Sequence, residues 1–132
     1  MQTNDHLKPT DSELEILNIL WEKGPCTVRE VHEVLEKSKE AGYTTTLKLM
    51  QIMHDKNLLK RDATNKSHIY TANISQEKTQ GQLVKRMIEN VFNGSASQLV
   101  MQALGQHKSN NDELQEIKRY LEEIEKRSST NK

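Results

Sequence analysis

Apolar residues recur at helical spacing in three stretches before residue 60. The first runs from Thr10 to about Lys23, the second from Thr27 to about Ser38, and the third from Tyr43 to Leu59. In each stretch, apolar positions three and four residues apart predict one buried helix face. Gly24-Pro25 separates the first two, because Gly accepts a positive φ and Pro cannot continue a helix. The pattern therefore predicts three short helices in succession.

The starts of these helices carry capping signals. Thr10-Asp-Ser-Glu13 and Thr27-Val-Arg-Glu30 both have the spacing of a capping box, in which a Thr hydroxyl and a Glu carboxylate satisfy free amides. In the third stretch we expect one hydroxyl of Thr44-Thr45-Thr46 to accept hydrogen bonds from the first turn. Asn57 should end that helix, since Asn tolerates the left-handed conformation.

After Asn57 the period changes from helical to alternating. Leu58-Leu59 leads into the polar, turn-rich run 62–67, and residues 68–74, HIYTANI, alternate as a strand does. Three short helices followed by a β-hairpin make a winged helix-turn-helix. We assign it to residues 10–75, after an arm at 1–9.

The remaining chain is helical in pattern. A helix is predicted from Gln76 to about Asn93 and broken by Gly94, a short helix follows Ser95, and a last helix spans 112–127, before a disordered tail at 128–132. The apolar stripe is wider than one small domain would cover, and the last helix has an a/d pattern. We predict that residues 76–127 form a dimerisation domain, with contacts from Leu83, Met87, Val91, Leu114, Ile117, Leu121 and Ile124.

Composition supports this expectation. Apolar residues make up 33% of the 132 residues and charged residues 29%, which is a small core for a self-sufficient domain. The single cysteine, Cys26, excludes a disulfide framework. The sequence contains neither a secretory signal nor a membrane span, so we expect a cytoplasmic protein without membrane insertion. It predicts no cofactor and no metal site.

Charge is balanced overall, with 19 basic and 19 acidic residues, but it is unevenly distributed. Between Tyr43 and Tyr70 the basic residues Lys48, Lys56, Lys60, Arg61 and Lys66 face only Asp55 and Asp62. Positive potential confined to one segment is typical of a protein that approaches phosphates with one face. The outer side of the third helix carries Thr45, Lys48 and Gln51, although an ordinary amphipathic helix would also have a polar side.

The order of these elements resembles the penicillinase-repressor family of bacterial transcription regulators. The likeness lies in TDSELEILNILWEKGPCTVREVHEVL, YTTTLKLMQIMHDKNLLKRD, HIYTANIS, VFNGSASQLVMQAL and DELQEIKRYLEE, and covers roughly Thr10 to Lys126. It implies a mostly α protein with a small β-hairpin, an N-terminal winged helix and a three-helix C-terminal dimerisation domain. It also implies a homodimeric repressor of a palindromic double-stranded DNA operator, controlling β-lactamase or related antibiotic-resistance genes.

Carried over to this sequence, the resemblance implies DNA contacts from Thr44, Thr45, Lys48 and Gln51 in the third helix and from Lys66, Ser67 and His68 in the wing. Antibiotic-responsive members are cleaved by a sensor-protease pathway at a bond that corresponds to Gln102-Ala103. They typically have Asn-Phe at that bond, so this chain departs from the pattern. Leu47 and Ile52 replace Arg of some relatives, so the operator sequence cannot be transferred.

The sequence is compatible with two classes of function. The first is a dimeric DNA-binding repressor, and the second is a winged-helix module that binds a protein partner without operator specificity. An enzyme is disfavoured, because the sequence has no nucleophile–base pair, no Gly-rich phosphate loop and no H-E-x-x-H motif.

Overall fold

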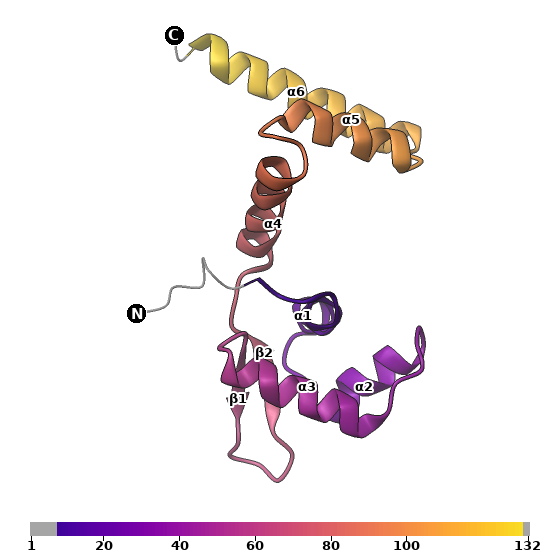
Figure 1. Cartoon of the computed structure of the whole chain (residues 1–132), viewed down its shortest axis with the longest axis vertical. Coiled ribbons are helices and arrows are strands. Elements are labelled where there is room, and N and C mark those ends of the chain that lie inside the picture. The colour runs from indigo at the N-terminus through magenta and orange to yellow at the C-terminus, as the bar shows by residue number, and fades with distance from the viewer. Residues whose placement is uncertain (1–7, 131–132) are drawn as a thin grey trace. The chain divides into compact units, whose positions relative to one another are not determined.

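The computed structural model describes residues 8–130, so most of the predicted arm and the last two residues lie outside the described part (Figure 1). The chain separates into two compact units, one ending at Lys85 and the other beginning at Arg86. In order, the described elements are α1 Asp11–Lys23, α2 Val28–Glu36, α3 Tyr43–Asp55, β1 Leu59–Asp62, β2 Ile69–Ala72, α4 Gln76–Asn90, α5 Ala96–Gln106 and α6 Asn111–Thr130.

Both predicted capping boxes are present in the first unit. The Thr10 hydroxyl accepts from the Glu13 backbone N–H at 3.2 Å, and Glu13 Oε1 accepts from the Thr10 N–H at 2.9 Å. Thr27 and Glu30 repeat this arrangement with the same two distances. Gly24 ends α1 with a φ of 84°, as the Gly-Pro pair predicted. These local signals fix where α1 stops and α2 starts.

The hairpin is tied to the helices through the backbone. β1 and β2 pair antiparallel, with Leu59 opposite Ala72 and Asp62 opposite Ile69. Tyr70 of β2 also exchanges two backbone hydrogen bonds with Cys26, at 3.0 and 2.8 Å. This bridge fixes the hairpin against the segment between α1 and α2, and Figure 1 shows the hairpin beside α3.

One apolar core joins these elements. Tyr70 is 1% exposed, and Cys26, which burial leaves with a raised pKa, packs in the same cluster. Met50 and Met53 of α3 are fully buried, as the apolar stripe predicted. The remaining buried members are Ile16, Leu17, Ile19, Leu20, Val28, Val31, Leu35, Leu58 and Leu59.

The first compact unit includes the beginning of α4, and the domain boundary at residue 75 stays a prediction. The indole Nε1 of Trp21 donates to the Ile74 carbonyl at 3.0 Å, and Thr79 in the first turns of α4 is buried. The division between the units therefore falls within α4.

The C-terminal helices differ from their predicted ends. α4 stops at Asn90 and not at Asn93, because Asn93 and Gly94 adopt positive φ values of 50° and 87°. The Ser95 hydroxyl caps α5 by accepting from the Gln98 N–H at 3.2 Å. The disordered tail predicted from Ser128 is wrong for residues 128–130, where α6 continues to Thr130. Ser and Thr disfavour a helix only weakly, and neither Gly nor Pro interrupts the run.

The predicted architecture is confirmed at the level of fold class. The structure is mostly helical with a small antiparallel hairpin, and it matches a winged helix followed by C-terminal helices. Among residues 8–130 we find no helix long and apolar enough to cross a membrane.

Candidate nucleic-acid interface

The third helix presents the predicted polar side chains to the outside. Thr44, Thr45, Lys48 and Gln51 are all exposed on α3. The predicted Thr cap is wrong: in the described structure the N-cap is Gly42, and no side chain caps the helix. All three threonines lie inside the helix, too late in the chain to serve its free amides. Thr44 and Thr45 are therefore left with hydroxyls that face solvent.

The hairpin loop carries the three predicted wing residues. Lys66, Ser67 and His68 are exposed and directly precede β2. Asp62 at the other side of the loop accepts from the Thr64 backbone N–H at 3.0 Å, which lowers the pKa of that carboxyl. This turn orders the beginning of the loop, and the exposed side chains lie at its end.

α3 and the hairpin loop enclose a shared cleft of about 420 Å³. Gln51 from the helix and Lys66, Ser67 and His68 from the loop all line it. Thr44, Thr45 and Lys48 do not line it. Tyr43, Leu47 and Gln51 follow one another at i, i+4 along the cleft side of α3, and Thr44 and Lys48 form the neighbouring row. The predicted residues thus form one continuous face, with the cleft along one edge.

Arg29 and Tyr43 also line the cleft, although the sequence did not single them out as site residues. Arg29 in the first turn of α2 places its guanidinium 5.4 Å from the ring centroid of Tyr43, and both residues line the cleft. A signal for Arg29 was present in the sequence. A cation is unfavourable near a helix N-terminus, so an Arg two residues after a capping Thr suggests an external anion.

Electrostatically the cleft suits an anion. Arg29 and Lys66 contribute positive charge, His68 can add another when protonated, and no carboxylate occurs among the described residues that line it. Gln51, Ser67 and Tyr43 add neutral hydrogen-bonding groups. This composition fits phosphate oxygens, which accept hydrogen bonds from cations, hydroxyls and amides.

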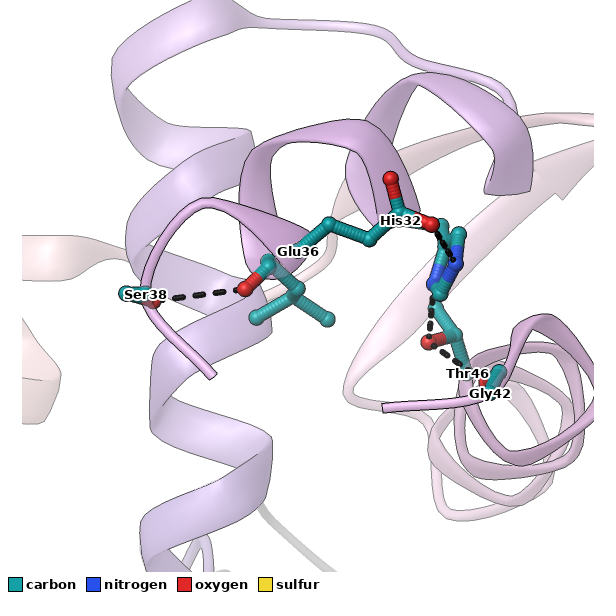
Figure 2. Close-up of polar contacts among 6 residues, drawn as sticks. His32, Glu36, Ser38, Gly42 and Thr46 are labelled. Atoms are coloured by element: carbon teal, nitrogen blue, oxygen red, sulfur yellow. Dashed lines mark hydrogen bonds and ion pairs between the residues drawn. The ribbon is translucent and has the colours of Figure 1, made fainter. Parts of the chain in front are cut away.

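A polar network lies beneath this face, between α2 and α3 (Figure 2). The ring of His32, which is 7% exposed, has Nδ1 3.0 Å from the Thr46 hydroxyl and Nε2 2.8 Å from a Glu36 carboxylate oxygen. The Thr46 hydroxyl also lies 3.5 Å from the Gly42 carbonyl. The His32–Thr46 contact was not predictable from the sequence, because only the packing of α2 on α3 makes these two residues neighbours.

The second unit leaves apolar side chains exposed. Of the predicted dimerisation residues, Ile117 of this unit and Leu83 of the first unit are half-buried. The others are largely exposed: Met87 46%, Val91 65%, Leu114 37%, Leu121 52% and Ile124 38%. Val100 and Met101 of α5 are exposed as well. Large exposed apolar patches usually mark interaction sites, so these side chains are candidates for one.

The predicted cleavage bond lies inside a helix. Gln102 and Ala103 are exposed residues of α5, and their backbone belongs to its regular helical run. A protease that needs an extended substrate could cut here only after α5 opened locally.

The comparisons with known proteins give a consistent family assignment. A family model described as penicillinase repressor matches residues 9–123. The penicillinase repressor of Staphylococcus aureus is 23% identical over 124 residues, which are 94% of this chain and 98% of that protein. The methicillin resistance regulatory protein MecI of Staphylococcus aureus (strain N315) is 22% identical over 112 residues, 85% of this chain and 91% of that protein.

A third relative matches a shorter segment at higher identity. The transcriptional regulator BlaI of Mycobacterium tuberculosis is 34% identical over 61 residues, 46% of this chain and 44% of that protein. The two staphylococcal matches cover most of both chains, so the likeness includes the C-terminal helices as well as the winged helix. This chain belongs to the penicillinase repressor family, which consists of transcriptional repressors and not of enzymes.

Proposed function

We propose that this protein is a homodimeric repressor that binds a palindromic operator through α3 and the hairpin loop. The observation that carries the proposal is the cleft between these two elements. Its lining joins Arg29, Lys66 and Gln51 without an opposing carboxylate among the described residues. The names of the relatives support control of penicillinase or methicillin-resistance genes as the class of target.

In this proposal α3 enters the major groove. Lys48 and Gln51 read base edges, since Gln suits adenine and Lys suits guanine. Thr44 and Thr45, near the helix start, donate hydroxyl hydrogen bonds to phosphates. These phosphate contacts fix the register of the helix and carry no sequence information by themselves.

The hairpin loop and the start of α2 hold the DNA backbone beside α3. Lys66, Ser67 and His68 approach one phosphate strand from the loop, and Arg29 approaches it from α2. The ring of Tyr43 lies under the guanidinium of Arg29 and restricts its orientation. The proposed site thus combines a helix that contacts base edges with cations beside it that contact phosphates.

Dimerisation through the C-terminal helices supplies the affinity that one winged helix lacks. The exposed apolar residues of α4 and α6 support this part of the proposal. Two copies would place their α3 helices on half-sites about 34 Å apart, one turn of DNA, or a multiple of that distance. Linking the two contacts raises affinity by about 10²–10⁴-fold without new contacts.

Release of repression follows from the same arrangement, because anything that breaks the dimer removes the gain in affinity that dimerisation supplies. A sensor protease that cuts at Gln102-Ala103 would do so, and it must first unwind part of α5. An alternative is dissociation of the intact chain by another signal. The Gln-Ala bond, in place of Asn-Phe, makes these two routes worth separating by mass spectrometry of the repressor from induced cells.

The proposal is tested by the salt dependence of DNA binding. The purified full-length protein is titrated onto the promoter duplex upstream of its own gene and onto a scrambled duplex, at 50 and 200 mM salt. We expect preference for the promoter and a steep loss of affinity with salt, because phosphate contacts release counterions. Weak, salt-insensitive binding to both duplexes would contradict the repressor mechanism and favour a protein partner for α3.

A further inference from the structure

The first turn of α3 differs from the starts of its neighbours. Side chains cap α1, α2 and α5, through Thr10, Thr27 and Ser95, whereas α3 in the described structure begins at Gly42 without one. The free amides of its first turn therefore have no N-cap side chain to donate to. Side chains of α2, however, contact this turn.

His32 of α2 makes two contacts with the first turn of α3. Its Nδ1 meets the Thr46 hydroxyl at 3.0 Å, and its ring meets the Tyr43 ring edge-on, with centroids 5.6 Å apart and an interplanar angle of 87°. Both partners belong to the first turn of α3, and Figure 2 shows His32 between Glu36 and Thr46. We propose that His32 is a positioning residue for DNA binding, which holds the first turn of α3 at its DNA-contacting angle through the hydroxyl of Thr46. This inference rests on the proposed function, because α3 must be the element that contacts DNA.

The hydrogen-bond directions follow from the chemistry of the partners. A carboxylate only accepts, so His32 Nε2, 2.8 Å from Glu36, carries a proton. In the neutral ring Nδ1 is then an acceptor, and the Thr46 hydroxyl donates to it. In the protonated ring Nδ1 donates instead, and the hydroxyl can turn to the Gly42 carbonyl at 3.5 Å. The link between the helices is satisfied in both states, so it holds whichever form of the ring is present.

The link connects directly to the proposed DNA face. Thr46 is buried, whereas Thr45 before it and Lys48 two residues later are exposed. The helix backbone transmits any rotation of this turn to both. Hydrogen bonds to base edges and phosphates weaken steeply with misalignment, so a small displacement reduces affinity without unfolding the domain.

The test uses matched substitutions in the full-length protein. Thr46→Val keeps the shape and removes the hydroxyl, Thr46→Ser keeps the hydroxyl, and His32→Leu removes both ring nitrogens. Ser38→Ala is the control, because the Ser38 hydroxyl donates to the Leu35 carbonyl in the turn after α2 and, among residues 8–130, forms no hydrogen bond with α3. Affinity for the promoter duplex is measured with circular dichroism and sedimentation of every variant.

We expect Thr46→Val and His32→Leu each to weaken DNA binding by about 3- to 10-fold, with secondary structure and oligomeric state unchanged. Thr46→Ser should retain most of the affinity, and Ser38→Ala should equal the parent. The double variant His32→Leu with Thr46→Val should bind no more weakly than the weaker single variant, since both remove one link. It also leaves neither polar partner orphaned, which guards against loss of folding.

Nuclear magnetic resonance of the free protein gives a second readout that instability alone would not produce. Amide signals of Thr44, Thr45 and Lys48 should shift in Thr46→Val and return in Thr46→Ser, and the imidazole nitrogens of His32 should show a protonated Nε2. Additive effects in the double variant, or Thr46→Val with the parent's affinity, would overturn the inference while the repressor function stands. A parent protein that does not bind the duplex would overturn both.

Discussion

At the scale of single residues, Lys48 and Gln51 are proposed to touch DNA, whereas His32 and Thr46 are proposed to support the helix that carries them. Lys48 and Gln51 are exposed and stand on adjacent rows of α3, so their removal should leave the core intact. We expect Gln51→Ala to weaken promoter binding by about 1–3 kcal/mol and to relax preference at one base pair. Lys48→Ala should weaken binding and reduce the salt slope by about one.

Both variants are checked by salt titrations of promoter binding, with sedimentation to confirm the oligomeric state. Lys37→Ala is a suitable control, because Lys37 is an exposed cation at the opposite end of α2 from Arg29. Loss of the oligomer in either α3 variant would refute the placement of these residues on the DNA face.

A second residue-scale prediction concerns the buried carboxylate of Glu13. Burial by itself raises the pKa of Glu13, but the Lys56 ammonium at 2.8 Å and the Thr10 backbone outweigh it, and the net pKa is lowered from 4.5. The lowered value means that the ionised group stabilises the fold at and above its ordinary pKa. This contribution is lost as the pH falls below about 4.5.

We therefore expect Glu13→Gln to reduce the free energy of unfolding by about 1–2 kcal/mol at pH 7, and by less at pH 3. Urea denaturation at both pH values measures the difference. Glu15→Gln is the matched control, because the Glu15–Lys39 pair at 3.1 Å is exposed and should contribute about 0–1 kcal/mol. An equal effect of both substitutions would contradict a special role for Glu13.

At the scale of elements, the helix starts differ in how they are held. Thr27 caps α2 through a full capping box, whereas Thr45 lies within α3 and faces solvent. Thr27→Ala should therefore lower the free energy of unfolding by about 1 kcal/mol. Thr45→Ala should leave it unchanged or slightly raised, because Ala is the better helix former. Thermal denaturation of the two variants compares them, and a larger loss for Thr45→Ala would mean that the first turn of α3 is capped by a threonine after all.

The same elements show what the sequence could and could not predict. Capping boxes, Gly24-Pro25 and Asn57, which has a φ of 67°, act within a few residues, so the helices and the hairpin were predictable. The cleft was not, because Arg29 and Lys66 come together through contacts between distant segments, among them the Cys26–Tyr70 bridge. The His32–Thr46 contact likewise depends on tertiary packing, which periodicity does not encode.

At the scale of the whole molecule, the proposed dimerisation depends on the exposed apolar side chains of the C-terminal helices. We expect Leu121→Asp combined with Ile124→Asp to give a folded monomer that no longer binds the promoter at nanomolar concentration, because buried carboxylates oppose association. Sedimentation velocity and circular dichroism check this result. A double variant that still sediments as a dimer would show that these α6 positions do not belong to the interface.

The central claim is that two chains occupy one operator, and sedimentation equilibrium of the protein with its own promoter duplex tests it most directly. The experiment measures the mass of the protein alone and of the complex at low and high salt. We predict a dimer that adds two chains to one duplex at low salt and leaves it at high salt. A complex with a single chain, or a dimer indifferent to the duplex, would contradict the account.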